Sequence, residues 1–208
     1  KPYKKTPVQP ADMDAVRASV PFFEKTGLLF TWHADQKEMQ ALARVGSTNE
    51  EIMLGNQELH DFFFSHITWT KEEDAKKKLG FYIKTLELPP PIEGLFKIIQ
   101  NWNVMKILKK VGFPAFVGTG NAGIYSSSAA IGTIAIPAIT KENLVLAGRA
   151  FERIWITAAA RGIHLQPLTG TMFMNIFAEN VPEGHFSSAE RALLKKRIGE
   201  LRSVTGRT

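Results

Sequence analysis

The stretch that most constrains the fold runs from residue 140 to residue 170, where a long amphipathic segment ends at a single glycine. Apolar residues recur in it at intervals of three and four, which is the spacing of one helix face rather than of a strand. Thr140 is placed to cap the start of this helix, and Arg161 and Gly162 are placed to end it. The sequence therefore predicts a helix over residues 140–161.

The remaining faces of this predicted helix also carry apolar side chains, including Val145, Leu146 and Ile156. A helix that is apolar on most sides is expected to be buried on most sides. We therefore expect it to pack against a sheet and also against a partner surface. A helix in the core of one domain explains the same pattern without a partner.

The residues that follow, Ala-Arg-Gly-Ile-His-Leu-Gln-Pro-Leu-Thr-Gly at 160–170, resemble the helix, strand and turn of the FMN-dependent nitroreductase superfamily. That family carries the pattern G-[small or apolar]-x-x-x-P-[apolar]-x-G there. The resemblance implies a short strand through His164 and a turn whose backbone N–H groups face the flavin, where a glycine permits close approach. It assigns cofactor-binding roles to Gln166, Pro167, Leu168, Thr169 and Gly170. Many family members carry an acidic residue where this chain has Thr169.

The first eight residues, Lys-Pro-Tyr-Lys-Lys-Thr-Pro-Val, are similar to the end of an R-x-T-N-R-x-P-Y signature in a double-length branch of the same superfamily. This resemblance implies that the chain is the second half of a fused, two-copy protein, with phosphate-binding arginines upstream of Lys1. A basic, disordered start is the alternative interpretation.

The resemblance also implies the fold class, α+β. We expect a three-layer α/β/α arrangement with a mostly antiparallel central sheet, in one nitroreductase-like domain over residues 1–208. The pattern of apolar residues agrees, because it predicts helices at 12–25 and from 35, a helix over 49–67 kinked near Gly55, and strands at 28–32 and 129–136.

Residues 70–128 are interpreted as a helical insertion. They include a charge-dense run at 71–78, three consecutive prolines at 89–91 and an apolar and basic helix predicted over 92–111. We expect a lid over the flavin or a brace against another half. Docking of this helix on a membrane surface is the alternative.

Several other kinds of site are not supported by the sequence. Residues 118–123 fit G-x-G-x-x-G, but we expect a flexible loop there, because a dinucleotide site must follow a strand and open a helix. The three serines at 126–128 lack a nucleophile elbow. No cysteine is present and the five histidines form no metal-ligand pair, so no metal site is expected. No apolar run reaches the length of a membrane span.

We therefore expect an FMN-dependent NAD(P)H oxidoreductase that passes hydride through the flavin N5 atom to a nitroaromatic, quinone or similar small acceptor. No catalytic side chain is assigned, since the flavin supplies the chemistry. A catalytically degenerate, flavin-storing or structural half is the alternative. The expected partner is a second nitroreductase-like half or a second copy of the chain in a homodimer. The expected location is the cytoplasm. The net charge of +6 alone does not predict nucleic-acid binding.

Overall fold

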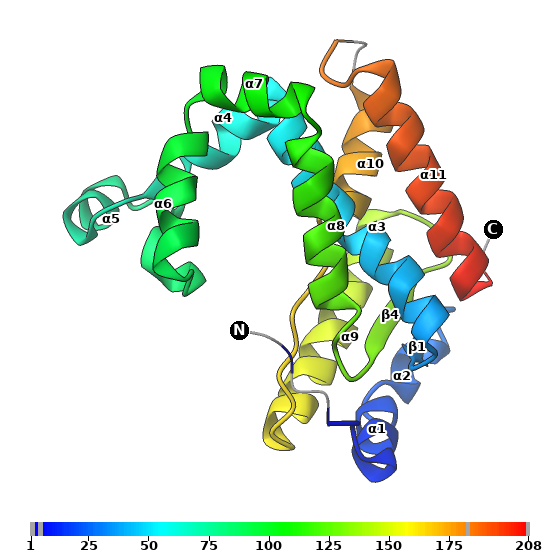
Figure 1. Cartoon of the computed structure of the whole chain (residues 1–208). Helices are drawn as coiled ribbons and strands as arrows, with labels where there is room; N and C mark the ends of the chain where they lie inside the picture. Colours follow the sequence, from blue (N-terminus) through cyan, green and yellow to red (C-terminus); the bar gives the residue numbers. More distant parts are fainter. Residues whose placement is uncertain (1–2, 4–5, 182–183, 207–208) are drawn as a thin grey trace. The chain divides into compact units, whose positions relative to one another are not determined.

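The computed structural model describes residue 3 and residues 6–181 and 184–206 (Figure 1). These residues form an α+β fold that is mostly helical. The chain divides into two compact units. The first contains residues 47–121 and 170–195, and the second contains the residues up to 46, residues 122–169 and those from 196 onward. Each unit is described separately below.

The elements follow one another along the chain as labelled in Figure 1. The strands are β1 (Leu29–His33), β2 (Ile67–Thr68), β3 (Phe81–Tyr82) and β4 (Ile131–Ala135), and a 3-10 helix, η1, covers Ile83–Leu86. The helices are α1 (Pro10–Arg17), α2 (Pro21–Glu24), α3 (Gln36–Gly55), α4 (Gln57–Ser65), α5 (Lys71–Lys77), α6 (Pro90–Ile99), α7 (Trp102–Lys110), α8 (Phe113–Tyr125), α9 (Lys141–Ala160), α10 (Gly170–Asn180) and α11 (Ser188–Thr205).

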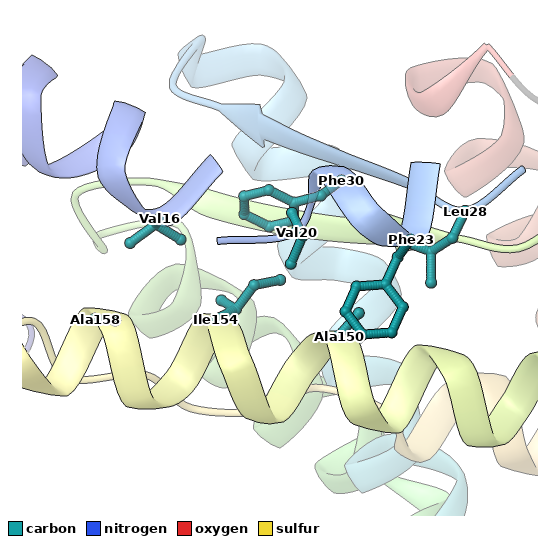
Figure 2. Packing of buried hydrophobic residues seen from close by; sticks show 8 residues of the cluster. All are labelled: Val16, Val20, Phe23, Leu28, Phe30, Ala150, Ile154 and Ala158. Atoms are coloured by element: carbon teal, nitrogen blue, oxygen red, sulfur yellow. The ribbon is translucent and has the colours of Figure 1, made fainter. Parts of the chain in front are cut away.

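The second unit is built on an antiparallel pair of strands, β1 and β4, in which Thr31 lies opposite Thr133. Both strands were expected from their apolar sequence, although β4 is only half-buried instead of buried. Side chains from the segment 16–30 are directed toward the face of α9 (Figure 2). The buried cluster contains Val16, Val20, Phe23, Leu28, Phe30, Ala150, Ile154 and Ala158. This cluster fixes α9 against the strand pair.

Helix α9 begins and ends as its sequence predicts. The Thr140 side chain accepts a hydrogen bond from the Asn143 N–H at 3.2 Å, and Gly162 follows the helix with a φ of +69°. The expected burial on most sides is wrong for the described chain, however. Val145 and Ile156 keep 63% and 64% of their surface exposed. The covered face is the one that meets the cluster in Figure 2.

The first unit has two buried clusters. The larger contains Leu54, Phe64, Ile67, Ile83, Ile99 and Met105. The smaller contains Ile52, Ala178, Phe186 and Leu194. The single helix predicted over 92–111 is instead two helices, α6 and α7. The break has a local cause, since the Asn101 side chain accepts a hydrogen bond from the Asn103 N–H at 2.9 Å and so caps a new helix.

The loop expected over residues 118–123 is also wrong, because these residues lie inside α8. The G-x-G-x-x-G pattern therefore follows helix α7 and lies within a helix, which is not the setting of a dinucleotide site. Gly118 has a packing role: a Cβ built on it would lie 3.1 Å from the Cβ of Glu51 in α3. Gly118 therefore permits close approach of α8 and α3 without forming a turn.

The end of the chain matches its pattern. Ser187 and Glu190 form a capping box at the start of α11, with the Ser187 N–H donating to the Glu190 carboxylate at 2.8 Å and the Glu190 N–H donating to the Ser187 Oγ at 3.3 Å. Among the described residues, no helix is both long and apolar enough to cross a membrane. Part of the predicted motif at residues 1–8 lies outside the described residues, as positions 1–2 and 4–5 are not among them.

Candidate functional site

The segment that was assigned to the flavin, residues 163–169, connects α9 to α10 and is neither helical nor part of a sheet. The short strand predicted through His164 is therefore wrong. A strand needs a neighbour for its backbone hydrogen bonds, and no described strand pairs with this segment. The segment leaves α9 through Ile163, whose N–H donates to the Ala158 carbonyl at 2.9 Å.

The backbone N–H groups of this segment are its main chemical feature. Within the described part of the chain, no N–H of residues 164–169 donates a hydrogen bond to a backbone or side-chain acceptor. Gln166, Pro167 and Thr169 are exposed, and Leu168 is half-buried. Exposed donors without an internal acceptor are satisfied by water or by a ligand. Apart from Pro167, which has no N–H, these groups are thus not used by an acceptor among the described residues.

Gln166 is held by a tyrosine from the start of the chain. The Tyr3 hydroxyl donates a hydrogen bond to the Gln166 Oε1 at 2.5 Å. Burial raises the pKa of Tyr3 above its ordinary value, so the hydroxyl keeps its proton and remains a donor. With its oxygen occupied in this way, the Gln166 side-chain amide has its NH2 group left to donate to a ligand.

The Leu168 side chain anchors the segment 163–169 to helix α3. A Cβ built on Gly46 of α3 would lie 2.9 Å from the Leu168 Cδ1, so the leucine side chain lies directly on the glycine backbone. Side chains larger than glycine at position 46 would displace Leu168. One apolar contact therefore holds the middle of the segment while its exposed neighbours keep their N–H groups accessible.

Gly170 belongs to the other compact unit, where it begins α10. A Cβ on Gly170 would lie 2.7 Å from the Asn49 Cγ. A larger side chain at position 170 would displace Asn49, because the space next to the Gly170 Cα is filled by that side chain. The glycine is required by packing against α3, whatever else it does.

A buried polar cluster that the sequence did not indicate lies at the end of β1. His33, which is 3% exposed, contacts the Glu38 carboxylate through Nδ1 at 2.8 Å and the Thr133 hydroxyl through Nε2 at 3.0 Å. The order of carboxylate, imidazole and hydroxyl fixes the orientation of the ring. Because Thr133 lies 100 residues away in the sequence, spacing alone carried no signal for this contact. Both ring nitrogens are satisfied, as a buried histidine requires.

A cleft of about 500 Å³ lies in the first unit, and its lining includes none of residues 166–170. It is lined by Ile67, Thr68, Trp69, Glu73, Lys76 and Lys77. The described residues contain no group of three or more His, Asp or Glu side chains able to hold a metal ion.

Comparison with known proteins identifies no relative: no family model, no curated protein and no solved structure matches the chain. The site must therefore be interpreted from its own geometry. That geometry consists of an exposed, extended segment with free N–H groups, anchored at Leu168 and flanked by a fixed glutamine.

Proposed function

We propose that the chain is an FMN-dependent NAD(P)H oxidoreductase domain of nitroreductase type, acting on a nitroaromatic, quinone or similar small acceptor. The observation that carries this proposal is the set of N–H groups at residues 164–169 that have no acceptor in the described chain. A flavin needs donors beside its reactive edge, and its isoalloxazine ring would supply hydride transfer when bound. The residue types therefore fit the group.

In this proposal the chain's own residues bind and orient. The N–H groups of Leu168 and Thr169 would bind the electron-rich edge of the ring, where a fixed donor stabilises negative charge. The Gln166 NH2 group adds a side-chain donor, held in place by the Tyr3 hydroxyl at 2.5 Å. No carboxylate of the segment competes for these donors, because Thr169 stands where an acidic residue is common in the family.

We further propose that the antiparallel pair of β1 and β4 belongs to the central sheet of a three-layer fold. We also propose that the protein is located in the cytoplasm. The partner would be a second nitroreductase-like half or a second copy of this chain. The exposed apolar side chains of α9 support a partner, because Leu144, Val145, Trp155 and Ile156 each keep 40% or more of their surface uncovered. Large exposed apolar patches mark association surfaces.

The proposal is tested with a pair of variants at one exposed residue. Thr169→Pro removes the backbone N–H, and Thr169→Ala removes only the side chain and serves as the control. We expect purified protein to bind FMN with quenching of flavin fluorescence, and NADPH to bleach the bound flavin until a quinone restores it. The proline variant should bind FMN about tenfold more weakly, the loss of one hydrogen bond to a charged group. Equal affinities in the two variants would refute the assignment.

The second candidate function is a flavin-storing or structural half without turnover. The packing of Gly170 against Asn49 favours it, because the glycine is then required by the fold alone. In the same experiment this candidate predicts FMN binding without bleaching by NADPH, or no FMN binding by any variant. The first result indicates storage, and the second indicates a structural role.

A further inference from the structure

The cleft of the first unit is a separate site from the flavin segment. It is an open depression of about 500 Å³ lined by residues of β2 and helix α5 and by Trp69. This is within the range of roughly 300 to 1,000 Å³ that is usual for small-molecule pockets. Its lining brings together apolar, aromatic and charged side chains, so both the shape and the chemistry of a ligand are restricted.

Helix α5 presents one face to the cleft. Glu73, Lys76 and Lys77 are spaced by three and four residues, which places them on the same side of a helix. The helix is fixed at its start by a capping box, in which the Thr70 side chain accepts from the Glu73 N–H at 3.1 Å. The positions of the two lysines are therefore set by a short but well-capped helix.

The only carboxylate in the lining is already used. Glu73 Oε2 accepts hydrogen bonds from the N–H groups of Trp69 at 2.7 Å and Thr70 at 3.3 Å. Lys77 donates to the Ser65 carbonyl at the end of α4. Lys76 is exposed and has no hydrogen-bond or ion-pair partner among the described residues. One ammonium group in the lining is thus left to bind an anion.

Trp69 supplies the flat surface of the site. It is half-buried, packs against the cluster that contains Ile67, and carries the Lys97 ammonium 5.8 Å from the centre of its ring. An indole held in this way offers stacking area to a planar ring, and aromatic pairs gain free energy beyond the area they bury.

We propose that this cleft binds a small aromatic anion, with its ring against Trp69 and its negative group at Lys76. Carboxylates, sulfonates and phosphates on an aromatic ring share this chemistry. The proposal is independent of the flavin assignment, because none of residues 166–170 lines the cleft. It predicts that affinity depends on both the ring and the charge of the ligand.

The test uses three probes and calorimetry on the whole chain: naphthoate, the uncharged naphthylmethanol, and the non-aromatic cyclohexanecarboxylate. We expect saturable binding of naphthoate at one site, and binding of the other two that is weaker by about tenfold or more, since each lacks one of the two interactions. No saturable binding of naphthoate, or equal binding of all three probes, would overturn the proposal.

Two variants in the same helix locate the site. Lys76→Gln should weaken naphthoate binding about tenfold, whereas Lys71→Gln, an equal change of charge outside the cleft, should leave it unchanged. Trp69→Leu should weaken it about fivefold. Trp69 also packs in a core cluster. If Trp69→Leu does not fold for this reason, the comparison of the two lysine variants decides the test alone. Equal effects of the two lysine variants would overturn the assignment.

FMN separates this proposal from the proposed function. In one outcome FMN displaces naphthoate from the parent and from Thr169→Pro, but not from Lys76→Gln. This outcome would support the cleft as an aromatic-anion site and would overturn the flavin assignment to residues 166–170. Binding of FMN that responds only to Thr169→Pro would leave the two sites separate, and the naphthoate results would then decide the cleft alone.

Discussion

Gly170 lies directly against Asn49, so that a Cβ on the glycine would be 2.7 Å from the Asn49 Cγ. The same region contains a second link between the two helices, because the Asn49 N–H donates to the Thr171 hydroxyl at 3.1 Å. The beginning of α10 therefore packs closely against α3 because Gly170 has no side chain, and the hydrogen bond from Asn49 to Thr171 stabilises this contact.

The first prediction is that Gly170→Ala destabilises the protein by about 1–3 kcal/mol, the usual cost of overpacking. The measurement is urea unfolding followed by circular dichroism. Gly120→Ala in α8 is the control, since nothing lies within 4 Å of its added Cβ and alanine is favoured inside a helix. If both variants unfold at the same urea concentration as the parent, the described contact with Asn49 does not constrain position 170.

The second prediction concerns the buried histidine. Thr133→Val keeps the shape of the side chain but removes the hydroxyl 3.0 Å from His33 Nε2. One buried nitrogen then lacks a partner, and we expect a loss of about 1–3 kcal/mol in the free energy of unfolding. Thr31→Val is the matched control, because Thr31 lies opposite Thr133 in the strand pair and has no recorded side-chain hydrogen bond. A similar loss in both variants would show that the hydroxyl next to His33 is not responsible.

Much of the fold was predictable where the signal is local. Thr140, Glu190 and Gly162 are residues whose roles at helix ends follow from their types and positions, and the structure confirms them. The break between α6 and α7 was missed for an equally local reason: Asn101 is a helix cap, but apolar residues on both sides of it continue the helical spacing. The three glycines at 118, 120 and 123 led to the prediction of a loop, although all three lie inside α8.

The candidate site was predictable only as a segment. Residues 166–170 were selected by resemblance, and their role as a cofactor site stays a prediction. Their contacts could not be predicted, because the partners are distant in the sequence. Tyr3 is hydrogen-bonded to Gln166, 163 residues away, and Leu168 contacts Gly46 of α3. The expected strand failed for the same reason: sequence indicates that a segment is extended, but a strand also needs a neighbour.

The third prediction is a pH dependence at the ion pair between Lys84 and Glu93, whose nitrogen and oxygen are 2.6 Å apart. The hydrogen bond from Lys84 lowers the pKa of Glu93, and the bond to Glu93 raises the pKa of Lys84. The stabilisation from Glu93 is therefore present above its ordinary pKa of 4.5 and lost as the pH falls through the lowered value. That from Lys84 is present below its ordinary pKa of 10.5 and lost as the pH rises through the raised value.

Lys84→Gln should accordingly lower the urea midpoint near neutral pH, and its difference from the parent should close in acid below the lowered pKa of Glu93. Lys106→Gln is the control, because Lys106 is exposed and has no recorded partner in the described chain. The gap should also narrow at high salt, since Lys84 is 58% exposed. A difference from the parent that is constant from acid to neutral pH would contradict the pairing.

The last prediction tests the partner proposed for α9. Ile156 of α9 is 64% exposed, and a carboxylate placed there would have to be buried by any partner covering this side of the helix, at a high cost in free energy. Ile156→Glu should weaken association of the chain with its partner, whether a second copy or a second half, by about tenfold or more in sedimentation equilibrium. It should leave the unfolding midpoint of the isolated chain nearly unchanged, because the side chain already faces water. Gln40→Glu makes the same change of charge at an exposed position of α3 and should leave association intact. If Ile156→Glu associates as the parent does, the partner surface lies elsewhere and the exposed face of α9 has no part in it.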